Sequence, residues 1–361
     1  MTISELPSQT KTTANTGRSY IYSITLTSSQ MESQFLQIKP QSVDYKNFMA
    51  LVPGPYQLLT VWYEPQVKLP TVKDSLRFMH IIYLFFYSDI TTVMIPCMTF
   101  AILGAITNSA LTFEPVSMFD LFYGCTQALL WLWGVLMVFD INNQNSPESI
   151  EEDRLNKPSR PIASGLISPE AASYLLKAMI AVTLGISYYN GVIQETLALF
   201  VLYWLYDNQG GNEDWFMRNL LAAGGYIFYA LGSLAIISNH SETKAAKLWM
   251  IIFGLVILTT IHAQDFRDME GDQLKGRTTL PLIMGSKTGR MTLAASLMFW
   301  SIFCPYYLGL PLYAYGLTAG FAGTTGLRFI SKTDNTSDKK SFHLYCLWVA
   351  AMLQLPAMAS A

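Results

Sequence analysis

The chain has 361 residues, of which 51% are hydrophobic and only 13% are charged, whereas an ordinary soluble domain has about 25% charged residues. A net charge of −2 gives no electrostatic reason to expect nucleic-acid binding. The four cysteines are far apart and lie mostly in apolar runs, so neither a disulfide framework nor a metal cluster is indicated. This composition is typical of an integral membrane protein, and nothing in it points to a protein partner.

The first part of the chain differs from the rest. Residues 1–45 are rich in Ser, Thr and Gln, which predicts a disordered or weakly ordered cytosolic tail. Residues 47–66 are apolar but are broken by Pro53 and Pro55, a pattern that favours a segment lying at the membrane surface. We therefore expect a polar tail with an interfacial segment over residues 1–75 and a transmembrane catalytic domain over residues 76–361.

Long apolar runs fill the second part and predict an all-α bundle, since a membrane-spanning helix needs about 20 residues. Two of the runs are short, so nine spans is our count and eight is the alternative. The expected spans lie near residues 80–106, 119–140, 170–191, 194–207, 217–238, 246–264, 288–308, 311–328 and 342–358.

The distribution of charge predicts the orientation. If the tail is cytosolic, the loops after the even-numbered spans also face the cytosol, and they carry most of the Lys and Arg residues of this domain. The opposite loops carry only Lys244 and Lys247. This is the positive-inside pattern. It also places two acidic clusters, at residues 142–161 and 265–277, on the same side of the membrane.

The second cluster directly follows the sixth apolar run. Its aspartates, spaced by three and four residues so that they share one helical face, are Asp265, Asp268 and Asp272. Carboxylates of this kind bind Mg²⁺ against a substrate phosphate, and Lys275 and Arg277 are placed to bind the phosphate itself. Gly271 and Gly276 permit close approach of a ligand to the backbone. A solvated acidic helix end is the alternative, but the density of carboxylates, glycines and cations favours a metal and diphosphate site.

The first cluster has a similar spacing with less charge. Its oxygen-bearing side chains, expected along one helix stripe as a second Mg²⁺ site, are Asn145, Ser149 and Asp153. Pro158 and Pro161 end the helix and shape a loop that carries Lys157 and Arg160, two further candidates for diphosphate binding. Taken alone, this cluster is equally well explained as a polar loop with an N-cap serine before glutamates.

Together the clusters predict metal-assisted ionisation of an allylic diphosphate, because cations stabilise the departing diphosphate as it gains charge. The remaining carbocation needs an apolar cavity with aromatic faces. Any one aromatic side chain is more often explained by packing against lipid or another helix than by contact with a cation. The candidates are Phe122, Tyr123, Trp131, Trp133, Tyr203, Trp204, Tyr206, Tyr226, Phe228, Tyr229, Phe299 and Trp300.

Two other residues have two interpretations each. Arg218 opens the fifth span on the cytosolic side, where it could bind the diphosphate or serve as an ordinary positive-inside anchor. His262 lies one turn before Asp265 and could accept a proton, although a buried histidine of the core is the better interpretation.

From these motifs the chain resembles the UbiA superfamily of intramembrane prenyltransferases over residues 80–358. Residues 265–272, continuing to Gly276-Arg277-Thr278-Thr279-Leu280-Pro281, match the second motif of that family, and residues 156–162 match the segment after its first motif. The resemblance implies a nine-helix bundle with a lateral cavity open to lipid and two Asp-rich motifs on the cytosolic side. In this alignment Asn145 and Asp153 match outer positions of the first motif, whereas Ser146 and Ser149 replace its two other aspartates.

This departure is similar to the Asn-x3-Ser-x3-acid motif of soluble class I terpene cyclases and to a fungal branch of UbiA proteins that cyclise sesquiterpenes. It implies Mg²⁺-dependent cyclisation of farnesyl diphosphate without a second substrate. The alternative is a prenyltransferase with an aromatic or other acceptor, and a non-catalytic transporter or scaffold is the third hypothesis. The N-terminal segment lacks the Arg-rich amphipathic pattern of a mitochondrial signal, so we expect the endoplasmic reticulum.

Overall fold

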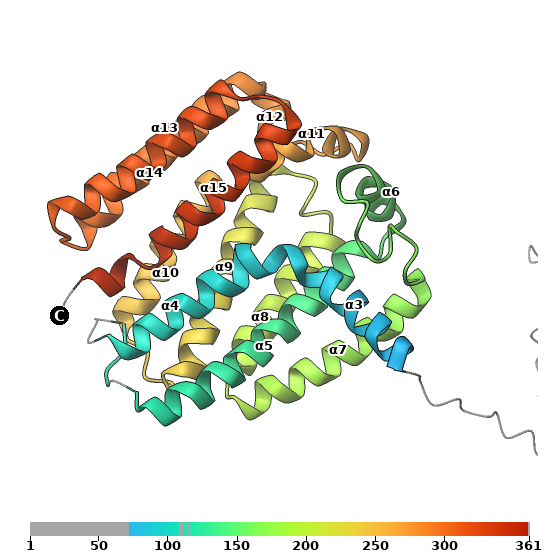
Figure 1. The fold of residues 1–361 in the computed structure, drawn as a ribbon, viewed down its shortest axis with the longest axis horizontal. Coiled ribbons are helices and arrows are strands. Elements are labelled where there is room, and N and C mark those ends of the chain that lie inside the picture. Colours follow the sequence, from blue (N-terminus) through green and yellow to red (C-terminus); the bar gives the residue numbers. More distant parts are fainter. Residues whose placement is uncertain (1–71, 108–110, 115, 360–361) are drawn as a thin grey trace, which may run out of the picture. The chain divides into compact units, whose positions relative to one another are not determined.

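The computed structural model describes residues 72–107, 111–114 and 116–359, and these residues are almost entirely helical (Figure 1). Two isolated β-bridges, Thr112 with Glu242 and Asp214 with Thr278, join loops. The tail and interfacial segment predicted for residues 1–75 lie outside the described residues, except that the first helix begins at Val72.

Helices lie over each of the nine expected membrane spans. In chain order the elements are α3 (Val72–Asp89), η3 (Ile90–Met94), α4 (Ile95–Ile106), α5 (Met118–Gln144), α6 (Pro147–Asn156), α7 (Pro169–Tyr189), α8 (Ile193–Tyr203), η4 (Trp204–Asn208), α9 (Trp215–Ile237), α10 (Lys244–Thr260), η5 (Ile261–Gln264), α11 (Asp265–Leu274), α12 (Leu280–Met284), α13 (Ser286–Tyr307), α14 (Leu312–Ser331), α15 (Asn335–Leu353) and η6 (Leu355–Met358).

Five of these helical stretches, within the described part of the chain, are long and apolar enough to cross a membrane. They are Lys73–Ile106, Met118–Gln144, Pro169–Tyr189, Trp215–Ile237 and Lys244–Leu274. The helices α8, α13, α14 and α15 coincide with the other four expected spans but do not meet the same criteria of length and apolarity. The all-helical membrane fold is therefore confirmed, and the count of nine spans stays a prediction.

Polar side chains fix where several of these helices begin. Ser117, Ser168 and Thr243 each accept a hydrogen bond from a backbone N–H of the first turn of α5, α7 and α10. Asp214 accepts two such bonds at the start of α9. These caps satisfy N–H groups that have no partner within the helix.

The helix α9 lies at the centre, packed against α4, α5, α8 and α10, and its buried small residues allow close approach. A side chain at Gly232 would overlap the ring of Trp131, and the indole of Trp131 donates to Thr196 Oγ1 on α8 at 2.8 Å. The core is thus built around large rings that fit against glycines.

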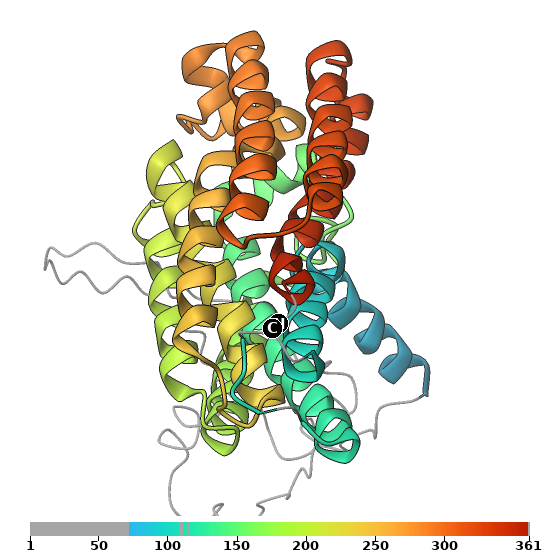
Figure 2. The same ribbon diagram turned by 90° about the vertical axis from the view of Figure 1, so that its left-hand side faces the viewer.

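The last three long helices, α13 to α15, stand together beside this group (Figure 2). Arg290 on α13 donates through Nη1 and Nη2 to the two carboxylate oxygens of Asp338 on α15, at 2.6 and 2.7 Å. The guanidinium also lies over the ring of Phe266, 4.5 Å from its centroid. This buried ion pair holds α15 against α13 and brings both toward α11.

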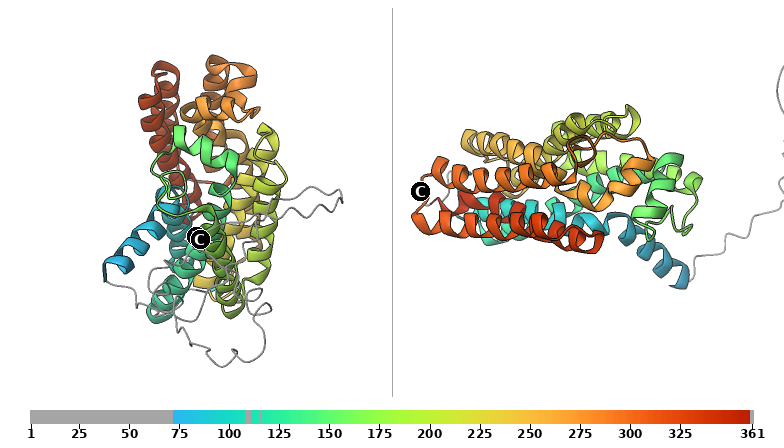
Figure 3. Two further views of the ribbon diagram at one scale, coloured as in Figure 1. Left: turned by 90° about the vertical axis from the view of Figure 1, so that its right-hand side faces the viewer. Right: turned by 90° about the horizontal axis from the view of Figure 1, so that it is seen from above.

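The short polar helices α6 and α11 lie in contact at one end of the long helices (Figures 1 and 3). Each contains one of the two acidic clusters. The expectation that the clusters lie at the same end of the bundle is therefore confirmed by the contacts between α6 and α11.

Candidate active site

Close packing of α6 on α11 brings the two clusters together. Gly271 on α11 faces Asn156 at the end of α6, and a Cβ at this glycine would overlap the Asn156 amide. The same amide donates to the backbone carbonyl of Asp268 at 3.4 Å. Gly271 thus permits approach of a helix, which corrects the expectation that it permits approach of a ligand. Gly276 has φ +73° and ends α11, a conformation that glycine adopts at low cost.

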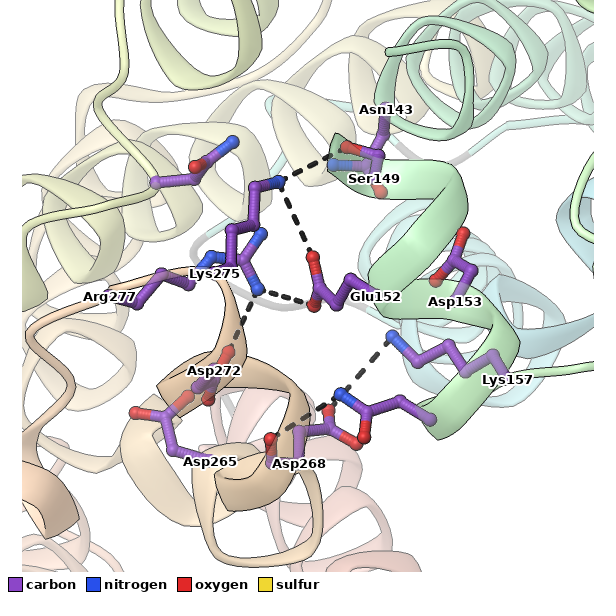
Figure 4. Close-up of polar contacts among 12 residues, drawn as sticks. Asn143, Ser149, Glu152, Asp153, Lys157, Asp265, Asp268, Asp272, Lys275 and Arg277 are labelled. Carbon is purple, nitrogen blue, oxygen red and sulfur yellow. Dashed lines mark hydrogen bonds and ion pairs between the residues drawn. The ribbon is translucent and has the colours of Figure 1, made fainter. Parts of the chain in front are cut away.

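Ion pairs cross between the two clusters (Figure 4). Arg277 Nη1 donates to Glu152 Oε1 at 2.5 Å and to Asp272 Oδ1 at 2.8 Å, so that this one guanidinium joins α6 and α11. Lys275 Nζ lies 3.3 Å from Glu152 Oε2 and donates to Ser149 Oγ at 3.1 Å. We call Ser149, Glu152, Asp272, Lys275 and Arg277 the clamp.

The other predicted cations surround the clamp. Arg218 Nη2 lies 3.1 Å from Asp265 Oδ1, and its Nη1 lies 3.8 Å from Asp272 Oδ1. Lys157 Nζ lies 3.9 Å from Asp268 Oδ2, which pairs the loop after the first cluster with the second cluster. Arg218 is only 5% exposed, so it is part of this site and not an exposed surface anchor.

The three aspartates of α11 are buried, with exposed fractions of 1% for Asp265, 5% for Asp268 and 0% for Asp272. Burial of charge is costly unless partners compensate it. At Glu152 burial would raise the pKa, but the charges of Arg277 and Lys275 outweigh it and hold the pKa below its usual value. The site is therefore a set of buried ions of opposite charge that compensate one another. A bound anion could replace the carboxylates as the partner of the cations.

A cavity of about 680 Å³ opens beside the clamp, a size typical of ligand pockets. Its polar end is lined by Ser149, Glu152, Lys157, Arg160, Arg218, Asp268 and Arg277. Its interior wall is aromatic, with the rings of Phe139, Tyr203, Tyr206, Tyr226 and Tyr229. Phe139 packs on Tyr203 at a centroid distance of 5.1 Å and on Tyr206 at 5.8 Å. The cavity therefore has a charged mouth and an aromatic interior.

Only some of the aromatic candidates belong to this wall. Tyr203, Tyr206, Tyr226 and Tyr229 line the cavity, whereas Trp131 packs in the core. The side chain of Phe122 is 77% exposed. The remaining candidates are also absent from the lining: Tyr123, Trp133, Trp204, Phe228, Phe299 and Trp300. His262 is buried beside Phe266, outside the lining, in agreement with its interpretation as a core residue.

The expected stripe of the first cluster is wrong in one respect. The helix breaks between Gln144 and Pro147, so Asn145 ends α5 while Ser149 and Asp153 lie on α6. The Asn145 amide donates to Ser173 Oγ at 2.8 Å, and the residue lines a second pocket of about 250 Å³.

The acid of this cluster has a cation as its partner. Both carboxylate oxygens of Asp153 accept from Arg160 Nη1 at 2.9 Å. The helix α6 ends at Asn156, directly before the loop of Lys157, as the two prolines indicated. The roles of Asn145 and Asp153 as metal ligands stay predictions.

The buried oxygen donors beside the mouth suit a divalent cation. Asp272 Oδ2 is buried and accepts no hydrogen bond from the described residues, so one hard oxygen is free for a ligand. No group of three or more His, Cys, Asp or Glu side chains in the described part of the chain has the spacing of a finished metal site. The donor set therefore fits Mg²⁺ in the way this ion is often bound, by a few carboxylates with substrate phosphate completing the shell.

Some residues of the site were not among the sequence candidates. Glu152 follows Ser149 by three positions on α6, so both side chains lie on the helical face next to Lys275 and Arg277. This shared face can be recognised only once α6 is known to begin at Pro147. Asp89 and Asp140 line the cavity from α3 and α5. Their positions inside predicted spans were the available signal, because acidic residues are rare in such segments.

Comparison with known proteins agrees with this architecture. Residues 81–350 match the UbiA prenyltransferase family. The chain is 31% identical over 233 residues to the fumagillin beta-trans-bergamotene synthase of Aspergillus fumigatus, covering 64% of this chain and 75% of that protein. It is 25% identical over 284 residues to the somaliensene A/B synthase of Streptomyces somaliensis, covering 77% and 92%. A polyprenyl transferase of Hericium erinaceus is 28% identical over 296 residues, covering 81% and 99%.

Solved structures share the fold. A UbiA homologue from Archaeoglobus fulgidus bound to GPP and Mg²⁺ superposes with a TM-score of 0.52 at 14% identity, covering 78% of this chain and 99% of that chain. A digeranylgeranylglyceryl phosphate synthase gives a TM-score of 0.50 at 18% identity, covering 78% and 99%. Because the family match extends over most of the transmembrane domain, this chain is an integral membrane enzyme that belongs to the UbiA prenyltransferase family.

Proposed function

We propose that this enzyme ionises farnesyl diphosphate with the help of Mg²⁺ and cyclises the resulting cation to a sesquiterpene, with no second substrate. The observation that carries the proposal is the cavity itself: a mouth lined by Lys157, Arg160, Arg218 and Arg277 leads directly to a wall of aromatic rings. The charged mouth suits a diphosphate, and the aromatic interior suits an isoprenoid chain that becomes a carbocation.

In this proposal the cations of the clamp change partners when substrate binds. Lys275 and Arg277 leave part of their contact with Glu152 and bind diphosphate oxygens, which places the scissile C–O bond at the entrance of the aromatic cavity. Asp265, Asp268, Asp272 and Ser149 would hold Mg²⁺, which supplies positive charge to the departing diphosphate when bound. Arg218 keeps the buried carboxylates of α11 compensated throughout.

The aromatic wall then controls the cation. Tyr203 and Tyr229 are joined by a hydrogen bond of 3.0 Å between their hydroxyls, and Tyr226 donates to the carbonyl of Thr92 at 2.8 Å. These hydrogen bonds fix the positions of the three rings, and the ring faces stabilise the charge of the cation.

We further propose that all nine long helices cross the membrane, that the cavity opens laterally to lipid, and that the site faces the cytosol from the endoplasmic reticulum. Support comes from the excess of Lys and Arg in the loops at the end where α6 and α11 lie. A lateral opening would let the prenyl chain enter from the bilayer while its diphosphate stays at the aqueous surface.

Transfer of the prenyl group to an aromatic or other acceptor is the second candidate. The likeness to a polyprenyl transferase favours it, whereas the likeness to the two terpene synthases favours cyclisation. The serines at positions 146 and 149, where the family motif has aspartates, also favour cyclisation in our proposal.

Incubation of the purified protein with Mg²⁺ and farnesyl diphosphate alone tests the proposal. We expect diphosphate release together with a volatile hydrocarbon, detected by gas chromatography. A prenylated acceptor, with hydrocarbon absent, would instead establish transfer. Asp268→Ala should abolish turnover, while Glu270→Ala, an exposed position on the same helix, should leave it unchanged. Equal activity of the two variants would refute the site.

A further inference from the structure

One face of α9 lines the cavity from its charged mouth to its aromatic end. The residues of α9 in the lining are Arg218, Leu221, Ala222, Gly225, Tyr226 and Tyr229. Their spacing of three and four residues places them on a single helical stripe. Because a helix rises about 1.5 Å per residue, Gly225 lies about 10 Å beyond Arg218 along the helix axis, and Tyr229 lies about 16 Å beyond it. Position along this stripe is therefore a measure of depth in the cavity.

The helix α5 packs on α9 and lines the cavity over the same depth. Asn143 lies at the mouth, where its Oδ1 accepts from Arg160 Nη1 at 3.3 Å, and Leu136 lies about two turns deeper. At the deep end the hydroxyl of Tyr229, the last cavity residue of α9, is joined to that of Tyr203 on α8 by a hydrogen bond of 3.0 Å. The cavity thus extends between α5 and α9, and the side chains along these helices set its length.

Two glycines of α9, seven positions apart on the same face, have different neighbours. At Gly232 a Cβ would overlap the indole of Trp131, which fills the space beside this glycine. This indole is fully buried and is held by its hydrogen bond to Thr196 at 2.8 Å. At Gly225 the nearest atoms to an added Cβ, outside the backbone of the helix, belong to Tyr229, with Cε2 in ordinary contact at 3.4 Å. A core ring occupies the first space, whereas the second is left open.

The open space beside Gly225 belongs to the cavity. Gly225 is buried, so this space lies inside the protein and not on its lipid-facing surface. The residue is also part of the lining of the cavity of about 680 Å³. Glycine is less favourable than alanine inside a helix, and unfilled space is rare in close-packed protein interiors. A buried glycine that faces such space therefore points to a ligand that fills it.

We propose that Gly225 is a specificity-determining residue that leaves space for the distal part of the prenyl chain, which deepens the function proposed above and rests on it. With the diphosphate bound at the mouth beside Arg218, the chain follows the stripe of α9 into the cavity. The part of the chain farthest from the diphosphate then passes the position where Gly225 has no side chain. A larger side chain there would take up this space, and a shorter prenyl chain would still fit in front of it.

The specificity that follows is one of chain length. The charged residues of the mouth lie about two turns of α9 away from Gly225, so a substitution at this glycine leaves their contacts with the diphosphate in place. The side chains of Leu221 and Tyr226, which flank Gly225 on the stripe, give the cavity an apolar wall here. An apolar wall distinguishes ligands by size and shape, and one methylene in such a pocket changes binding by about tenfold or more.

Binding of two unreactive substrate analogues tests the proposal. They are the thiolo forms of geranyl and farnesyl diphosphate, in which sulfur replaces the bridging oxygen. Each is titrated with Mg²⁺ present into wild type, Gly225→Ala, Gly225→Leu and Gly185→Leu. Gly185 on α7 is the matched control, because it is exposed, lies outside the cavity lining and has no atom within 4 Å of an added Cβ. For Gly225→Leu we expect the Kd of the farnesyl analogue to rise about tenfold or more, and that of the geranyl analogue to change by less than about threefold.

Gly225→Ala should shift the ratio of the two Kd values in the same direction by a smaller factor, and Gly185→Leu should match wild type. An equal change in both Kd values of Gly225→Leu would overturn the proposal, as would unchanged values. If Gly225→Leu fails to fold, the ratio in Gly225→Ala decides, because its Cβ makes only an ordinary contact with Tyr229. Failure of the proposed function is distinguished by turnover, since wild type given farnesyl diphosphate would then release no hydrocarbon.

Discussion

The contact of Gly271 with Asn156 predicts that Gly271→Ala destabilises the wild-type protein but stabilises an Asn156→Ala variant. Alanine is favoured over glycine inside a helix by about 1 kcal/mol, so Gly271→Ala would stabilise α11 if space allowed. Space does not allow it, because the new Cβ would overlap the Asn156 amide. The amide must turn away, which loses its hydrogen bond to the Asp268 carbonyl, worth about 0.5–1.5 kcal/mol. Residual overpacking adds about 1–3 kcal/mol.

Gly271→Ala should therefore destabilise the wild-type protein by about 0.5–3.5 kcal/mol. In an Asn156→Ala background the overlap is gone, and the same substitution should stabilise by about 1 kcal/mol. Gly185→Ala is the matched control, since this helical glycine on α7 has no atom within 4 Å of the added Cβ and should stabilise in both backgrounds.

Unfolding of the detergent-solubilised variants measures these differences, and the rate of diphosphate release measures their effect on the site. Because α6 moves away from α11 in Gly271→Ala, the rate should fall in this variant and recover when Asn156→Ala is added. Equal destabilisation by Gly271→Ala in both backgrounds would refute the steric argument.

Two further predictions concern the clamp. Ser149→Asp should raise the KM for farnesyl diphosphate several-fold, because the new carboxylate competes with the diphosphate for Lys275, which donates to the serine in the wild-type protein. Ser149→Asn adds no charge and is the control. An equal KM in both variants would contradict the argument. Glu152→Gln should make the stability of the folded protein less dependent on pH in the acidic range. The pKa of Glu152 is lowered in the folded protein, so its contribution is complete above its unfolded pKa of 4.5 and is lost as pH falls through the lower folded value. Thermal unfolding between about pH 6 and pH 3 should show a smaller decrease in the variant than in wild type, and identical slopes would contradict it.

Local patterns predicted the parts of this structure that depend on local forces. Apolar length located the long helices, and the spacing of Asp265, Asp268 and Asp272 placed them on one helix, α11. Charge in the loops placed the two clusters at one end, and their contact agrees.

The break at Asn145 is also local: Ser146 caps α6, as the alternative with an N-cap serine before glutamates indicated, and this overrides the regular spacing of the first motif. Features that depend on contacts between distant residues were not predictable. The pairing of Glu152 with Arg277 joins residues 125 positions apart.

The two wide turns η3 and η4 have a consequence for the shape of the cavity. In each, a backbone N–H bonds five residues back, as Ile95 does to Ile90 and Gln209 does to Trp204. Such a turn is equivalent to a single inserted residue, which turns the following segment by about 100° relative to a regular helix. One continuous helical stretch can then present Asp89 to the cavity and, a few turns later, Phe100 to the protein interior. A gain or loss of one codon at either place would therefore reshape the cavity, because η3 contributes Ile90 to Val93 and η4 contributes Tyr206 to its lining.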